Sequence, residues 1–129
     1  MNGLKIGNLT ARVPVIQGGM GVGISLSGLA SAVANEGGVG VISCAGLGLI
    51  YRDKAKTYMD ACICGLKEEI RKAKEKTSGS VGVNIMMALT NFSDMVKTAI
   101  SEKADVIFAG AGLPLDLPKY RTEGCTTKL

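Results

Sequence analysis

Short apolar runs and longer stretches of helical periodicity alternate along this chain. Four apolar runs predict buried strands, and they lie at residues 13–17, 39–45, 81–87 and 105–112. The run at 39–45 contains no polar alternation, which indicates a strand covered on both faces, as in a parallel sheet.

Between these runs, apolar residues recur with the 3.6-residue period of a helix. The three predicted helices run from Ser25 or Ser27 to Gly37, from about 53 to 76, and from Asn91 to near Lys103. The resulting order, β-α-β-α-β-α-β, predicts an α/β fold in which four parallel strands alternate with three helices through right-handed crossovers.

Polar residues predict how two of these helices begin. Ser25 or Ser27 can cap the first helix, and Asn91 with Asp94 three residues later is typical of a capping box. The tail at 119–129 is polar and weakly patterned, so it carries no predicted element.

Composition narrows the function classes. Of the 129 residues, 47% are hydrophobic, which excludes a disordered chain, and the length fits one domain. The absence of histidine excludes Ser-His-Asp triads, Cys-His pairs and histidine-ligated metal sites within these residues.

The four cysteines include no CxxC pair, so we expect free thiols in a reducing compartment and no metal. No apolar run reaches the ~18 residues that a membrane span needs, so we expect a soluble, cytoplasmic protein.

The net charge of +4 is modest, and the basic residues at 67–76 are interleaved with acidic ones. Such a run is typical of a solvated helix face with pairs such as Glu68 and Lys72. Nucleic-acid binding is disfavoured, because the acids interrupt the positive field and no aromatic residue within the run can stack on a base. We expect no nucleic-acid partner, and the loops at the ends of the predicted strands favour a small-molecule substrate instead.

The carboxyl ends of the predicted strands carry the candidate chemistry, because ligands of parallel α/β sheets bind there. Those ends contain glycines at 18–21, 43–46 and 110–112, and Asn84 is a polar residue within an apolar strand. Glycine lets a flat ligand approach the backbone, and N–H and C=O groups with the Asn84 amide suit the edge of a heteroaromatic ring. A single such loop is more simply a turn, but several at one edge favour a ligand site. The two Gly-x-Gly pieces, at residues 21–23 and 110–112, do not extend to the longer glycine fingerprint of dinucleotide-binding proteins.

Three segments make the pattern more specific: PVIQGGMGVGISLSGLASAVANEGGVGVIS, GVNIMMALTNFSDMV and ADVIFAGAGLPLDLP. In this order and spacing they resemble the start of the nitronate monooxygenase family, which includes the flavin-dependent enoyl-acyl-carrier-protein reductases of bacteria. The resemblance covers residues 4 to about 129 and implies the first half of an FMN-binding TIM (β/α)8 barrel. It implies cofactor contacts at Gly19, Met20, Gly21, Asn84, Gly110, Ala111 and Gly112.

The resemblance also implies that much of the site belongs to later segments. A TIM barrel has eight βα units and ~250 residues, and the family's catalytic histidine and phosphate-binding loops follow the part matched here, so we assign no catalytic residue. We expect weak or no FMN binding. Because a half barrel has open sheet edges, we also expect self-association, misfolding or dimerisation into a pseudo-barrel. The implied activity is FMN-dependent oxidation of alkyl nitronates to carbonyl compounds and nitrite. The alternatives are a flavin-dependent enoyl-acyl-carrier-protein reductase and a catalytically silent fragment.

Overall fold

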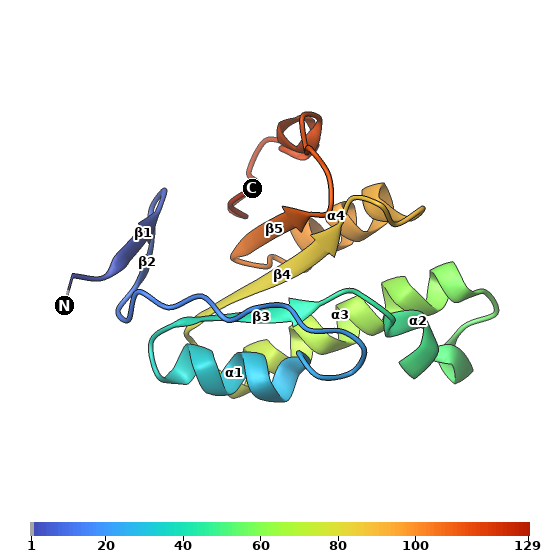
Figure 1. Ribbon diagram of the computed structural model, residues 1–129, viewed down its shortest axis with the longest axis horizontal. Helices are drawn as coiled ribbons and strands as arrows, with labels where there is room; N and C mark the ends of the chain where they lie inside the picture. The colour runs from blue at the N-terminus through green and yellow to red at the C-terminus, as the bar shows by residue number, and fades with distance from the viewer. Residues whose placement is uncertain (1) are drawn as a thin grey trace.

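Three parallel strands form the sheet at the centre of the computed structural model, which describes residues 2–129 (Figure 1). The strands, in their order across the sheet, are β3 (Val39–Ser43), β4 (Ser80–Met86) and β5 (Val106–Gly110). This parallel sheet, with helices between its strands, confirms the predicted fold class. The described residues close no barrel, which agrees with a half barrel.

Helices connect the strands, as Figure 1 shows. They are α1 (Ser27–Asn35) before β3, α2 (Leu47–Ile50) and α3 (Tyr58–Lys76) between β3 and β4, and α4 (Phe92–Ser101) between β4 and β5. Two 3-10 turns are η1 (Arg52–Lys54) and η2 (Leu117–Tyr120). The long helix α3 packs against both α1 and α4. Within residues 2–129, no helix combines the length and the apolarity that a membrane crossing requires.

The helix predicted from residue 53 begins only at Tyr58. Asp53 lies in η1, and the backbone at Ala55 is extended, with φ −152° and ψ 160°. Thr57 then caps α3, because its Oγ1 accepts the Asp60 N–H at 3.1 Å. This cap therefore sets the start of α3. The predicted helix is too long because Ala55 fits the helical spacing although it lies outside the helix.

The capping hydrogen bonds predicted for the other two helices do not form, although Asn91 occupies the predicted cap position of α4. The residue at the cap position of α1 is Leu26, and the Ser27 N–H donates instead to Glu69 Oε2 of α3 at 2.6 Å. Ser25 makes no capping bond either. Asn91 does precede α4, but its φ of −100° and ψ of 21° are not the extended values that aim a cap side chain at the helix, and it forms no such bond.

The strand predicted at 13–17 is an edge segment of the sheet. It pairs with β3 through one isolated parallel bridge, between Ile16 and Val39. The ladder is broken because the Val15 N–H donates to the Val13 carbonyl oxygen at 2.8 Å rather than to β3. We call residues 13–17 the edge segment below.

Two short pairings lie outside the predicted elements. β1 (Leu4–Ile6) and β2 (Leu9–Ala11) form an antiparallel hairpin, with Gly7 at φ +60° in its turn. In the tail, Lys128 forms a parallel bridge with Val106 of β5, and η2 precedes it. Strands of one to three residues are too short to produce a recognisable period-2 pattern, which explains why they were missed.

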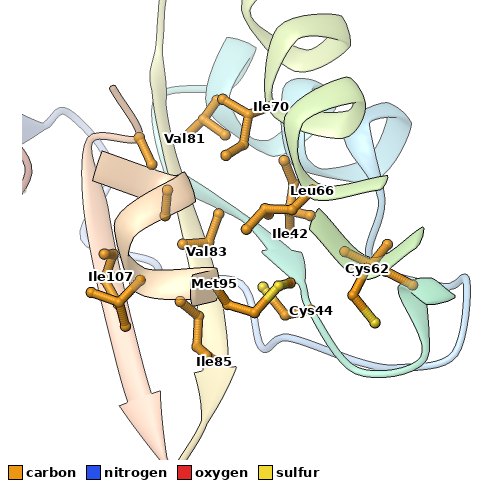
Figure 2. Close-up of a cluster of buried hydrophobic side chains, with 14 of the residues drawn as sticks. Ile42, Cys44, Cys62, Leu66, Ile70, Val81, Val83, Ile85, Met95 and Ile107 are labelled. Atoms are coloured by element: carbon orange, nitrogen blue, oxygen red, sulfur yellow. The ribbon is translucent and has the colours of Figure 1, made fainter. Parts of the chain in front are cut away.

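The core lies between the sheet and the helices (Figure 2). Its fully buried side chains come from β3, β4, α3 and α4 and include Ile42, Val83, Leu66, Ile70 and Met95. Gly40 brings α1 onto β3, because a Cβ at this position would lie 1.8 Å from the Ala30 carbonyl oxygen. The close approach of helix and strand therefore requires a residue without a side chain.

Candidate functional site

Predicted ligand residues from three parts of the chain meet at the carboxyl ends of the strands. Because β3, β4 and β5 are parallel, these ends share one edge of the sheet (Figure 1). Gly19 lies directly against Asn84, since a Cβ built at this glycine would come 2.6 Å from the Asn84 Cβ. A Cβ built at Gly110 would come 4.0 Å from Asn84 Nδ2. Asn84 is therefore the centre of the candidate site, with Gly19 and Gly110 beside it.

The side-chain amide of Asn84 is held by one hydrogen bond. Its Nδ2 donates to the carbonyl oxygen of Phe108, the residue paired with it on β5, at 3.2 Å. Its Oδ1 accepts no hydrogen bond from residues 2–129, and the residue is half-buried. The amide thus has a fixed orientation and an acceptor available to a ligand.

The loop after the edge segment, residues 18–21, offers backbone groups at alternate positions. We call it the glycine loop. The N–H and C=O groups of Gly19 and Gly21 make no hydrogen bond within residues 2–129. Met20 differs, because its N–H donates to Ser25 Oγ and its C=O accepts the Ser25 N–H, each at 2.9 Å. Met20 is 48% exposed and lies outside the buried core clusters.

The remaining predicted residues lie at other parts of the same edge. Gly21 lies against Ala45, just after β3, where a Cβ would come 2.8 Å from the Ala45 Cβ. Gly112 lies against Met87, after β4, at 3.0 Å by the same measure. Ala111, directly before Gly112 in the chain, has φ +55°, a left-handed conformation that favours glycine. These contacts extend the candidate site along the edge of the sheet.

Gln17 and Ser25 belong to the candidate site but are absent from the predicted ligand residues. The sequence pattern predicts only a helix cap at Ser25 and a strand end at Gln17. In the structure, Gln17 Nε2 donates to Ser25 Oγ at 3.0 Å, and Ser25 in turn binds the glycine loop. The one available signal is that Gln17 is polar, ends an apolar run and directly precedes the glycines.

The electrostatics of the site are those of neutral hydrogen-bonding groups. Cys44 follows β3, and its N–H donates to the Asn84 carbonyl oxygen at 3.0 Å. Burial of Cys44, with a smaller contribution from Cys62, raises the pKa of its thiol well above the ordinary value. This thiol stays protonated at neutral pH, so it does not act as an anionic nucleophile. Backbone groups and one amide are what the site offers to a ligand.

Comparisons with known proteins identify a family and two similar structures. The chain matches the sequence model of the family described as nitronate monooxygenase over residues 2–117. Two solved structures from Thermotoga maritima are similar to it: FabK, at 33% identity and a TM-score of 0.65, and a single-site mutant of FabK, at 32% and 0.63. The matches cover 88% and 82% of this chain but 32% and 31% of those chains, so this chain spans about a third of their length. Among curated proteins, no similar sequence is found.

Proposed function

Because the chain belongs to the nitronate monooxygenase family, a family of flavin-dependent oxidoreductases, we propose that it provides the ring-binding edge of an FMN site. The observation that carries this proposal is the contact of Gly19 with Asn84 at the carboxyl ends of the strands, beside unpaired backbone groups. Ligands of parallel α/β sheets bind at this edge.

The residues present suit a flavin ring. The ring is flat and heteroaromatic, and its pyrimidine edge alternates hydrogen-bond donors and acceptors. The backbone groups of Gly19 and Gly21 supply both kinds of partner, and Asn84 Oδ1 supplies a further acceptor. Because a Cβ at Gly19 would collide with Asn84, only glycine lets the loop lie this close to the amide.

Each residue has a distinct task in this proposal. FMN, when bound, supplies electron transfer to and from its ring. Gly19 and Gly21 would hold the edge of the ring by hydrogen bonds, and the amide of Asn84, fixed by Phe108, would orient it. Met20, with its exposed side chain, would be free to pack against the ring and shield it from water. None of these residues transfers a proton, because none of them titrates near neutral pH.

For the whole protein we propose the oxidation of alkyl nitronates to carbonyl compounds and nitrite. Reduction of an enoyl-acyl-carrier protein is the second candidate, favoured by the 33% identity to FabK. Two assays with added FMN separate these reactions: nitrite release from an alkyl nitronate, and NAD(P)H-dependent reduction of an enoyl thioester. A chain that binds FMN and catalyses neither reaction would support the third alternative, a catalytically silent fragment.

Substitution of two neighbouring glycines tests the flavin site itself. Gly19→Ala should abolish FMN-induced shifts at Asn84, because its Cβ would meet the Asn84 Cβ at 2.6 Å and displace the glycine loop. Gly18→Ala is the matched control, since nothing lies within 4 Å of a Cβ there. Both are measured by heteronuclear NMR during titration with FMN to millimolar concentrations. Equal shifts in the two variants, or none in the unsubstituted chain, would contradict the proposal.

A further inference from the structure

Ser25 is fully buried two residues before the start of α1, and its polar atoms bind the glycine loop. Its Oγ donates to the Gly18 carbonyl oxygen at 3.2 Å and accepts the Met20 N–H at 2.9 Å. Its backbone N–H donates to the Met20 carbonyl oxygen, also at 2.9 Å. Its own carbonyl oxygen accepts the N–H of Ser43 in β3 at 2.9 Å. One buried residue therefore joins the glycine loop to the sheet.

Gln17 orients the Ser25 hydroxyl. Its Nε2 donates to Ser25 Oγ and to the Val41 carbonyl oxygen, each at 3.0 Å, and its Oε1 accepts the Val41 N–H at 3.2 Å. The side-chain amide thus continues the pairing with β3 where the backbone of the edge segment has left it. Since the Ser25 oxygen accepts two hydrogens, its own hydrogen is directed to Gly18. We call this pair the Gln17–Ser25 clasp.

The clasp decides which backbone groups of the glycine loop stay unpaired. It occupies the carbonyl oxygen of Gly18 and both backbone groups of Met20. The groups of Gly19 and Gly21 remain available, and they are the ones beside Asn84 and Ala45 at the edge of the sheet.

We propose that Ser25, held by Gln17, is a positioning residue that sets the conformation in which the glycine loop binds a ligand. This inference rests on the proposed function of the loop as part of a flavin site. Ser25 touches no ligand in this account, because its hydroxyl is fully buried and its hydrogen bonds are all internal. It acts through the backbone that it holds in place.

Ser25→Ala and Ser31→Ala form a matched pair of variants. Both serines are buried, at 0% and 4% exposure, but the Ser31 Oγ bonds only the Gly28 carbonyl oxygen at 3.1 Å within its own helix. In Ser25→Ala we expect the Met20 amide to exchange with solvent about tenfold faster, the factor that loss of one internal hydrogen bond allows. FMN-induced shifts should need about tenfold more FMN. Ser31→Ala should change neither the Met20 exchange rate nor the FMN concentration that the shifts need. The exchange rates are first corrected for any change in global stability, which urea unfolding measures.

Gln17→Glu is the second variant, in case Ser25→Ala does not fold. The carboxylate keeps the size of the amide but has no hydrogen to donate to Ser25, so Met20 exchange should again accelerate. Unchanged Met20 exchange in the variants overturns the inference, and so does an equal loss of FMN-induced shifts in Ser31→Ala. If the unsubstituted chain shows no FMN-induced shifts, the proposed function fails. The exchange rate of the Met20 backbone amide then decides by itself whether Ser25 fixes the conformation of the glycine loop.

Discussion

Replacement of Glu69 by alanine should lower the free energy of unfolding by about 3–5 kcal/mol, because it removes the partner of two buried donors. The carboxylate is 4% exposed and joins three elements. Its Oε2 accepts the Ser27 N–H at the start of α1 at 2.6 Å, and its Oε1 accepts the Tyr51 hydroxyl at 2.5 Å. Lys72 Nζ lies 3.8 Å from the same Oε1. Alanine leaves both donors buried without a partner.

The magnitude follows from the kind and number of hydrogen bonds. A hydrogen bond to a charged group contributes about 1.5–3 kcal/mol, and this carboxylate accepts two of them. Glu69→Gln keeps one acceptor oxygen and should cost about half as much as Glu69→Ala. Tyr51→Phe removes one donor and leaves the other in place, so its cost should be about 1–2 kcal/mol. Because the two residues share a bond, the cost of Glu69→Gln combined with Tyr51→Phe should be less than the sum.

Urea unfolding measures these costs. We expect the midpoint concentration to fall while the slope of free energy against urea stays constant, which marks a change in stability alone. A loss below about 1 kcal/mol in Glu69→Ala would refute the reasoning, since a buried charged acceptor with two partners contributes more than that. Strict additivity in the double variant would show that Tyr51 and Glu69 do not interact.

The pH dependence of stability gives an independent check on the same residue. Burial alone would raise the pKa of Glu69, but the hydrogen bonds from Tyr51 and Ser27, with the charge of Lys72, hold this pKa below its ordinary value of 4.5. The carboxylate therefore contributes its full stabilisation above that value, and the contribution is lost as the pH falls through the lower folded pKa. Below about pH 4.5, the unsubstituted chain should lose stability more steeply than Glu69→Gln.

Three further outcomes test other parts of the structure. Ala111→Gly should raise stability by about 0.5 kcal/mol in urea unfolding, because relief of the left-handed strain at φ +55° exceeds the added flexibility of the unfolded chain; a lower midpoint would contradict this. A thiol reagent should modify the half-buried Cys64 in the folded chain but reach the buried Cys44 and Cys62 only on unfolding, and equal rates would refute that order. We also expect self-association through the edge segment, whose Val15 is 53% exposed; sedimentation as a compact monomer at micromolar concentration would exclude it.

The parallel sheet could be predicted from the sequence because each signal for it is local. The apolar runs contain or overlap β3, β4 and β5, and the helical period identified α3 and α4 between them. The four-residue helix α2 was not predicted, because one turn is too short to show a helical period. The predicted start of α3 is wrong for a physical reason, because two local signals compete there. Ala55 fits the apolar period, but the hydroxyl of Thr57 satisfies the Asp60 N–H and starts the helix later. Apolar spacing reports which residues face a core, and a cap decides where the helix begins.

The meeting of Gly19, Asn84 and Gly110 was also predictable, because parallel topology brings the ends of successive strands to one edge. The flavin itself stays a prediction. The Gln17–Ser25 clasp could not be foreseen, since Gln17 binds Val41, 24 positions later. Likewise, the donor at the start of α1 is satisfied by Glu69, 42 positions away. Polar contacts over such separations depend on the finished fold and leave no period in the sequence.

The glycines of this chain show the same limit, because one residue type occupies three different surroundings. A Cβ at Gly40 would lie 1.8 Å from a backbone oxygen of α1, so this glycine is required for the packing of helix on strand. A Cβ at Gly19 would meet the side chain of Asn84, so this glycine shapes the candidate site, and one at Gly18 would meet nothing within 4 Å. What lies opposite each glycine is set by strand order and by the crossovers between strands. The role of each glycine in a glycine-rich sequence can therefore be assigned only when the topology shows which residue lies opposite it.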